Sequence, residues 1–231
     1  MFDAIIVGAG VIGAAVAYEL SRYGGKFLVL EKEEDLCAGT TKANSGIAHG
    51  GYDAVPGTMK AKMNMAGIRM MEEMSKTLDF PFHKIGTLVL CHDEAQMADL
   101  EELLERGKAN GVPGLKILNH DEVLEMEPNL ADTVVAALYC SEAGVVNPFL
   151  MNIAYGEQAA VNGVDFHFNE KVLGLERSGK DQDRWLVRTS EKTYETRAVI
   201  NCAGVHSDEV SHMASSKTYS IRPRRGEYML L

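Results

Sequence analysis

The sequence predicts an α/β protein whose first domain is interrupted by an inserted α+β domain. Three observations support this prediction: an amino-terminal strand, glycine turn, helix and strand; a central stretch that breaks this rhythm; and a return to the first pattern near Asn147. At roughly 150 residues per domain, 231 residues suit one large domain or one and a half. The expected boundaries place residues 1–78 and 142–214 in the first domain, residues 79–141 in the insertion, and residues 215–231 in a further strand of the inserted domain.

Composition excludes several classes of protein. Lys and Arg number 23 against 33 Asp and Glu, so the formal net charge is −10 and no broad basic field is available for nucleic acid. The four cysteines lie far apart without a C-x-x-C pair, which argues against a metal or dithiol site and favours reduced thiols in the cytoplasm. The most apolar stretch, Ala4 to Leu20, carries internal glycines and no preceding Lys or Arg, so we expect neither a signal peptide nor a transmembrane segment.

The amino-terminal residues predict a strand, a glycine turn, a helix and a second strand. A short apolar run, Asp3 to Val7, predicts a strand, and the glycine-rich turn from Gly8 to Gly13 opens a helix that extends through Tyr23. Gly24 and Gly25 follow where a helix C-cap is expected, and Phe27 to Leu30 predicts a second strand. Strand, turn, helix and strand together indicate a βαβ unit.

A long amphipathic helix is predicted from Thr58 to Leu78. The methionines in it are compatible with a pliable binding surface, but a stripe that faces the core is the commoner cause of such a pattern. The apolar positions expected to face inward are Met63, Ala66, Gly67, Met70, Met71, Met74 and Leu78.

The inserted domain begins with a predicted strand from Gly86 to Cys91. Asp93 with Gln96 forms a capping-box pattern that opens a helix ending before Gly111. The remaining elements expected there are a strand at Lys116 to Leu118, a helical turn near Asp121 to Glu127 and a strand at Val134 to Cys140.

The first pattern resumes at Asn147, a good N-cap residue, and Pro148, which is tolerated at the first helical position. The helix is expected to end at Gly163, and a last helix is expected from Ser207 to Met213. A hairpin turn is predicted at residues 178–181. The strands predicted between the two helices are Asp165–Phe168, Val172–Glu176, Trp185–Thr189, Tyr194–Thr196 and Ala198–Cys202.

The glycine turn predicts a dinucleotide site, because it follows a strand and opens a helix. In such a turn Gly8 allows the tight bend, Gly10 lets the backbone approach a pyrophosphate, and Gly13 lets helix and strand pack closely. Glu31 follows Gly13 at close to the roughly 20-residue spacing of an acid that binds a ribose.

Nicotinamide and flavin dinucleotides both use such a unit. Two further features bear on the choice: the small and polar residues from Cys37 to Gly46, and a second strand that ends in glycine, Val199 to Gly204, followed by Asp208. A nicotinamide-dependent enzyme remains an alternative, which retention of a yellow flavin would eliminate.

Four stretches carry a resemblance to a known family: Val7–Gly13, Thr41–Gly51, Gly144–Pro148 and Asn201–Gly204. With them the sequence resembles the FAD-dependent oxidoreductases of the D-amino-acid oxidase superfamily. Within that superfamily it looks most like bacterial glycerol-3-phosphate dehydrogenases, with L-2-hydroxyglutarate dehydrogenases close behind. The resemblance spans essentially the whole chain and implies a Rossmann-like FAD-binding domain with an inserted, incomplete α+β substrate domain.

The resemblance also implies which residues hold the cofactor. Some relatives attach FAD covalently through a histidine in the loop after the acid, but Lys42 and Ala43 occupy the nearby positions here, so non-covalent FAD is expected. Glu31 would hold the adenosine ribose, with Lys32 beside it, and Val172 would meet the adenine through its backbone. The residues expected along the pyrophosphate and ribityl chain are Thr40, Thr41, Asn44 and Ser45, with Ala203 and Gly204 closing over the pyrophosphate.

Chemistry of this kind removes a hydride from a carbon that bears a hydroxyl while a base takes the hydroxyl proton. The resemblance places His49 near the flavin ring as the candidate base; a histidine that only hydrogen-bonds its loop is the equal alternative. Tyr52 is a candidate substrate contact. Arg224, one of a small group of arginines near the chain end, either faces an anionic substrate or belongs to an exposed strand end.

We therefore expect an FAD-dependent dehydrogenase or oxidase acting on a small anionic hydroxy compound, foremost sn-glycerol 3-phosphate. An L-2-hydroxy acid dehydrogenase is the first alternative. Relatives are longer than 231 residues by resemblance, so a truncated FAD-binding fragment without activity alone is the second. An electron-acceptor protein or a complementing chain are the partners expected, and the cytoplasm, including the inner face of the membrane, is the expected location.

Overall fold

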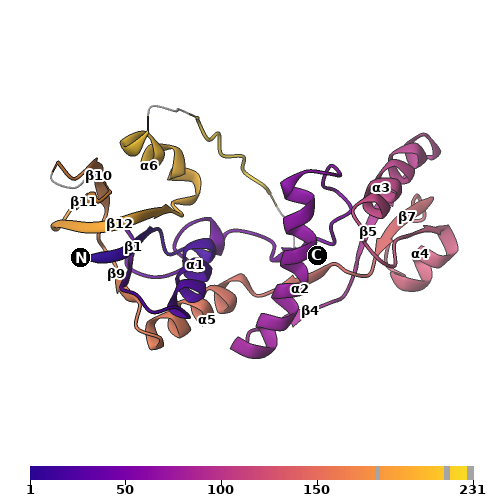
Figure 1. The fold of residues 1–231 in the computed structure, drawn as a ribbon. Helices are drawn as coiled ribbons and strands as arrows, with labels where there is room; N and C mark the ends of the chain where they lie inside the picture. The colour runs from indigo at the N-terminus through magenta and orange to yellow at the C-terminus, as the bar shows by residue number, and fades with distance from the viewer. Residues whose placement is uncertain (180–182, 216–218, 228–231) are drawn as a thin grey trace. The chain divides into compact units, whose positions relative to one another are not determined.

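The computed structural model describes residues 1–179, 183–215 and 219–227 (Figure 1). The chain folds into two compact units: unit 1 combines Met1–Asn44 with Pro148–Leu231, and unit 2 is Ser45–Asn147. These units divide the chain at other points than the predicted boundaries, since α2 (Met59–Leu78) packs against β4 (Phe82–His83) in unit 2. Which unit serves the cofactor and which the substrate stays a prediction.

Unit 1 is built on a six-stranded sheet with the strand order β10-β11-β12-β1-β2-β9 (Figure 1). Four neighbouring strands, β12, β1, β2 and β9, run parallel, while β11 and β10 are antiparallel additions beside β12. This confirms the predicted α/β class. The strands are β1 (Phe2–Val7), β2 (Phe27–Leu30), β9 (Asp165–His167), β10 (Val172–Arg177), β11 (Trp185–Thr189) and β12 (Thr193–Asn201).

Both faces of this sheet are covered. Ile5 and Val7 of β1 pack in one core with Val210 of α6 (Ser207–Ala214) and with the strands of the β10–β11 hairpin. Ile6, which is fully buried, points to the opposite face because side chains alternate along a strand. Helix α1 (Val11–Ser21) packs against β1, β2 and α5 (Pro148–Val161). The almost continuous apolar sequence of β1 reflects this two-sided burial.

Three details of the prediction for unit 1 need correction or restriction. Helix α1 ends at Ser21 rather than Tyr23, since the backbone N–H of Arg22 bonds to carbonyl oxygens of the last turn, and Gly24 and Gly25 do not adopt the positive φ of a glycine C-cap. The two strands predicted around Arg197 are one strand, β12, which pairs with β11 at its start and with β1 from residue 196 onward. The β10–β11 hairpin is confirmed, but residues 180–182 of its predicted turn lie outside the described residues.

Unit 2 contains an antiparallel sheet in the order β5-β7-β6, with one helix on each face. Leu138 of β7 packs with Leu100 of α3 on one side, and its neighbour Ala137 packs with Val123 of α4 on the other. The predicted strands and helices of this segment are confirmed. They are β5 (Thr87–Cys91), α3 (Met97–Ala109), β6 (Lys116–Asn119), α4 (His120–Met126) and β7 (Ala136–Cys140).

A second, smaller sheet in unit 2 was not predicted. Its order is β3-β8-β4, with β3 at Ile47–Ala48, β8 at Gly144–Val146 and β4 at Phe82–His83. Strands of two or three residues are too short to show an alternating pattern, and for this reason they could not be predicted from the sequence.

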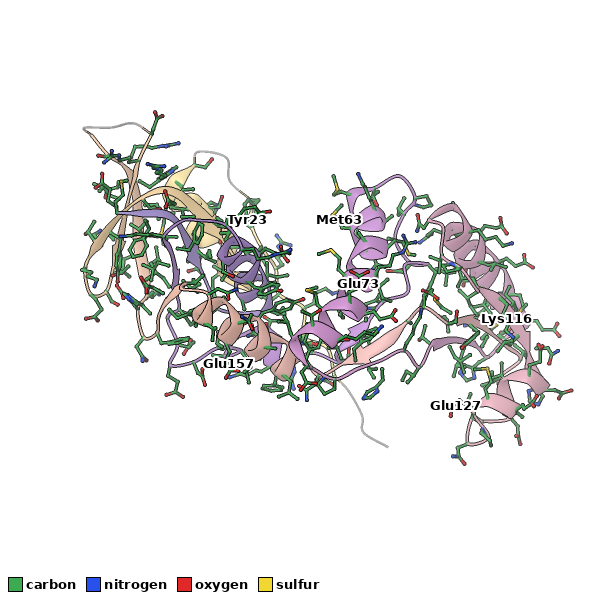
Figure 2. All side chains as sticks on the ribbon, turned by 60° about the horizontal axis from the view of Figure 1, so that its bottom comes forward. Tyr23, Met63, Glu73, Lys116, Glu127 and Glu157 are labelled. Carbon is green, nitrogen blue, oxygen red and sulfur yellow. The ribbon has the colours of Figure 1, made fainter. Side chains whose placement is uncertain are left out.

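The predicted inward face of α2 is partly wrong. Met63 and Met70 are 49% and 53% exposed, and Met63 projects from the helix in Figure 2. The buried residues are Ala61, Met65 and Ile68, which lie on another side of the helix. Because apolar residues occur on two sides of this helix, spacing alone could not select the side that faces the core.

The last described residues, 219–227, contain no helix or strand. Residues 228–231, on which the predicted strand at the chain end falls, lie outside the described residues. Among the described helices, none combines the length and the apolar character needed to cross a membrane.

Candidate functional site

The candidate site in unit 1 lies where the carboxyl ends of three parallel strands meet. Strand β1 has β2 on one side and β12 on the other; the chain leaves β1 through α1 to β2, and it leaves β12 toward α6. Backbone hydrogen bonds draw the strand ends together: Gly8 N–H donates to the Leu30 carbonyl oxygen and Cys202 N–H to that of Val7, at 2.8 and 2.9 Å. Ligands of open α/β sheets bind at such a point.

Two of the three glycines of the turn, Gly8 and Gly13, are required by the geometry. Gly8 has a φ of +103°, and a Cβ there would lie 2.6 Å from the carbonyl oxygen of Cys202. A Cβ on Gly13 would overlap the carbonyl oxygen of Gly8, so helix and strand could not approach as they do. Gly10 is the N-cap of α1 in extended conformation, and its nearest neighbour, Thr41 Oγ1, would lie 3.2 Å from a Cβ. The bare backbone at the helix start suits an anion.

The Glu31 carboxylate points toward the glycine turn rather than away from it. Its Oε2 accepts a hydrogen bond of 2.7 Å from Ala9 N–H, and its Oε1 accepts one of 3.0 Å from Glu33 N–H. The side chain is therefore held at the end of β2 beside the turn, as the predicted ribose acid requires.

Thr41 reaches the start of α1 from the next segment of unit 1. It lies in a 3₁₀ turn, Thr40–Lys42, is nearly buried, and its Oγ1 accepts a hydrogen bond of 3.0 Å from Val11 N–H. Its hydroxyl hydrogen can still be donated to an anionic oxygen. Asn44 stabilises this turn by donating from Nδ2 to the Thr41 carbonyl oxygen, whereas Thr40 is exposed.

Two further residues lie beside the turn, and one of them, Asn152, was not predicted from the sequence. Asn152 of α5 is fully buried and donates from Nδ2 to the Ala9 carbonyl oxygen at 3.1 Å. Cys37 lies close by with a φ of +65°, unusual for a residue with a side chain. Burial raises the pKa of the Cys37 thiol, and the hydrogen bond with Asn152 opposes that rise. A polar residue within an otherwise apolar helix face was the available signal for Asn152.

The remaining candidates of unit 1 belong to several different segments. Val172 is the buried first residue of β10, and Lys32 forms an exposed ion pair with Glu33 at 3.2 Å. Ala203 follows β12 and its Cα would lie 3.3 Å from a Cβ on Gly8, while Gly204 has a φ of +57°. Arg224 is exposed in the segment without helix or strand.

The other candidates, Ser45, His49 and Tyr52, belong to unit 2. His49 is exposed and follows β3, which pairs with β8. The next two residues fix the loop: a Cβ on Gly50 would overlap the Cys140 sulfur, and Gly51 has a φ of +91°. Burial raises the pKa of the half-buried Tyr52 hydroxyl. Their relation to the glycine turn stays a prediction.

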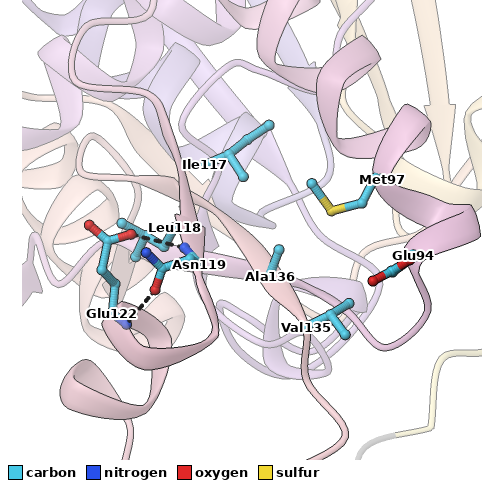
Figure 3. Close-up of a pocket in the computed structure, with 8 residues that line it drawn as sticks. All are labelled: Glu94, Met97, Ile117, Leu118, Asn119, Glu122, Val135 and Ala136. Atoms are coloured by element: carbon cyan, nitrogen blue, oxygen red, sulfur yellow. Dashed lines mark hydrogen bonds between the residues drawn. The ribbon is translucent and has the colours of Figure 1, made fainter.

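A shallow hollow in unit 2 is a weaker candidate (Figure 3). Its polar residues Asn119 and Glu122 form a capping box that starts α4, with Glu122 N–H donating to Asn119 Oδ1 at 3.1 Å and Asn119 N–H to Glu122 Oε2 at 2.9 Å. The other lining residues are mainly apolar, so nothing there points to a polar ligand. In the part of the chain that the structure describes, no three His, Cys, Asp or Glu side chains gather as a metal site.

Comparison with protein families gives one match, over residues 3–231, to the family described as FAD dependent oxidoreductase. Among curated proteins, the chain is 44% identical to glycerol 3-phosphate dehydrogenase of Caloramator mitchellensis, with 100% of this chain and 48% of that protein aligned. It is 32% identical to L-2-hydroxyglutarate dehydrogenase of Indibacter alkaliphilus, covering 98% of this chain and 57% of that protein.

Solved structures agree on the fold. An L-alpha-glycerophosphate oxidase from Mycoplasma pneumoniae with FAD bound matches with a TM-score of 0.86 and 32% identity, over 92% of this chain and 56% of that one. Glycine oxidase from Geobacillus kaustophilus matches with a TM-score of 0.85 at 23% identity, over 92% of this chain and 58% of that one, which bears on the fold alone. The chain spans about half the length of these curated relatives.

Proposed function

Because the chain belongs to the FAD-dependent oxidoreductase family, we propose that the protein removes a hydride from a small anionic hydroxy compound, foremost sn-glycerol 3-phosphate. The observation that supports this choice of substrate is the 44% identity, over the whole chain, to a glycerol 3-phosphate dehydrogenase. The residues of unit 1 fit non-covalently bound FAD, since the glycine turn exposes backbone where a pyrophosphate approaches and Glu31 lies beside it.

In this proposal, different residues of the chain bind different parts of FAD. Backbone N–H groups at the start of α1 and the Thr41 hydroxyl face the pyrophosphate, and Ala203 and Gly204 close over it. Glu31 accepts hydrogen bonds from the adenosine ribose, with Lys32 beside it, and the Val172 backbone meets the adenine. Asn44 and Ser45 follow toward the ribityl chain. The last of these, Ser45, lies in unit 2, so its share depends on how the two units meet.

His49 is the proposed base. FAD, when bound, supplies the acceptor for the hydride. The His49 imidazole takes the proton of the substrate hydroxyl as the general base. The loop is well suited to present it, because Gly50 and Gly51 hold the backbone against Cys140 and Met65. Tyr52 and Arg224 are proposed substrate contacts, with Arg224 directed at the anionic group.

L-2-Hydroxyglutarate is the second candidate substrate, supported by the 32% identity to a dehydrogenase for that acid. Both candidates are anionic secondary alcohols, so the same base and hydride acceptor serve either one. Electron transfer onward to an acceptor protein belongs to the same proposal.

The test is anaerobic reduction of the bound flavin. The purified chain is loaded with FAD, and its visible absorption is recorded as sn-glycerol 3-phosphate or L-2-hydroxyglutarate is added. Bleaching by glycerol 3-phosphate at a lower concentration than by L-2-hydroxyglutarate supports the proposal. Bleaching by L-2-hydroxyglutarate alone would show that this acid, and not glycerol 3-phosphate, is the substrate. Flavin that is bound but not reduced by either compound marks a cofactor-binding fragment without activity of its own.

A further inference from the structure

A buried carboxylate, Glu170, lies in the crossover between β9 and β10 and has no part in the cofactor contacts proposed above. The residue is only 5% exposed. Oε1 accepts a hydrogen bond of 2.6 Å from the Thr189 hydroxyl, and Oε2 accepts one of 2.8 Å from the Tyr194 hydroxyl. His167 Nδ1 lies 3.2 Å from the same Oε2. Three elements, β9, β11 and β12, thus contribute partners to one carboxylate.

Burial of a charged group costs free energy unless hydrogen bonds compensate for the lost water. The three side chains around Glu170 supply such hydrogen bonds. Burial acts to raise the pKa of Glu170, but the hydrogen bonds from Thr189, Tyr194 and His167 outweigh it, and the net pKa lies below its ordinary value. The carboxylate is therefore ionised at neutral pH and acts as a fixed acceptor between the strands. An apolar residue would fill the space, but it would not select one geometry for the crossover.

The backbone of this crossover is joined to the residues around Glu31. Glu170 N–H donates to the Glu31 carbonyl oxygen at 2.8 Å, and Glu31 N–H donates to that of His167 at 2.9 Å. Asn169, at a φ of +55°, donates its N–H to the Glu33 carbonyl oxygen at 2.8 Å. Two residues after Glu170, Val172 begins β10.

We propose that Glu170 is a positioning residue for the adenosine end of the cofactor site, which fixes the crossover that presents the Glu31 carboxylate and the Val172 backbone. This inference rests on the proposed cofactor site, in which Glu31 binds the ribose. Glu170 itself touches neither ribose nor adenine. Its effect passes through the backbone hydrogen bonds of Glu31, so the chemistry it controls is recognition of the ribose hydroxyls.

The test measures that recognition directly, without catalysis. Dissociation constants of the FAD-free chain are measured by calorimetry for ADP and for 2′,3′-dideoxy-ADP, which lacks the hydroxyls that Glu31 would bind. The unaltered chain is expected to prefer ADP by about tenfold, the order of one charge-assisted hydrogen bond. In Glu170→Gln the preference is expected to fall below about threefold, because Glu31 is no longer held in place.

Two further variants separate positioning from folding. Tyr194→Phe keeps the ring and removes one donor to Oε2, so a smaller loss of preference is expected from a chain that keeps its packing. Glu176→Gln removes the same charge from an exposed position on β10 and should leave the preference unchanged. Circular dichroism establishes that each variant is folded.

The outcomes are distinct. If the unaltered chain does not discriminate the two nucleotides, Glu31 is not a ribose ligand, and both the proposed cofactor site and this inference are overturned. If the unaltered chain discriminates and Glu170→Gln and Tyr194→Phe discriminate equally well, even with weaker binding of both nucleotides, only the positioning role is overturned.

Discussion

At the scale of single residues, the peptide groups of the glycine turn are held from two sides. Ala9 N–H donates to Glu31 and the Ala9 carbonyl oxygen accepts from Asn152, so one residue between two glycines is fixed at both its polar groups. A turn with bare backbone has little intrinsic rigidity, because glycine loses more conformational freedom on folding than other residues. The buried Asn152 thus stabilises the conformation in which N–H groups can face a phosphate.

Asn152→Leu is expected to weaken FAD binding about fivefold, since the Ala9 carbonyl loses one hydrogen bond. The free energy of unfolding should change little by comparison, because the substitution also removes Asn152 Oδ1, a buried oxygen for which the described residues offer no partner. Flavin fluorescence titration and urea unfolding measure the two quantities. Unchanged FAD affinity would exclude Asn152 from support of the turn.

His49→Ala is expected to slow reduction of the flavin by substrate by a factor of about 100 or more, within the range of a general base. The substrate concentration that gives half the maximal rate should change much less, because the exposed His49 is proposed to move a proton rather than to hold the substrate. Stopped-flow absorbance under anaerobic conditions separates the two effects. An unaltered reduction rate would leave His49 with a structural role in its loop.

At the scale of elements, sequence patterns located the long helices and the buried strands of unit 1 and placed the first residue of α5 at Pro148. They were less informative about caps. Asp93 does accept from Ala95 N–H, but Gln96 accepts from His92 rather than from Asp93, and a short 3₁₀ turn (Glu94–Gln96) precedes α3. A complete capping box lies at Asn119 and Glu122 and was not predicted, although the Asn-x-x-Glu spacing is its sequence signature.

We expect the stability of the fold to depend on pH because of Glu170, which lies in the crossover between β9 and β10. Since the pKa of Glu170 lies below its ordinary value of 4.5 in the folded chain, its contribution is fully present above that value and is lost as the pH falls through the folded pKa. Glu170→Gln should lower the free energy of unfolding at pH 7 by about 1 to 3 kcal/mol. Urea unfolding of the two proteins should therefore give curves that converge toward acid pH.

The exposed Glu176→Gln variant is the control for this pH series, and it should follow the unaltered chain throughout. A difference between Glu170→Gln and the unaltered chain that stays constant from neutral to acid pH would show that the carboxylate does not stabilise the fold through its charge.

At the scale of the whole molecule, the sequence was sufficient for the α/β class, the glycine turn between strand and helix, and the family, because each depends on residues close together in the chain or on a resemblance along it. Boundaries between compact units depend on packing at a distance. The compact units divide the chain after Asn44 and after Asn147, at other points than the predicted domain boundaries, which stay a prediction. The Glu170 partners come from three separate strands, so no local pattern reveals them.

The glycine turn is the feature on which the cofactor site depends, and equilibrium binding of FAD to two glycine variants tests it most directly. Gly10→Val places a branched side chain where the pyrophosphate approaches, close to Thr41, whereas Gly24→Val alters a glycine with open space around it and no positive φ. We expect Gly24→Val to retain FAD like the unaltered chain and Gly10→Val to lose it while remaining folded. Equal FAD affinity in the two variants would contradict the account.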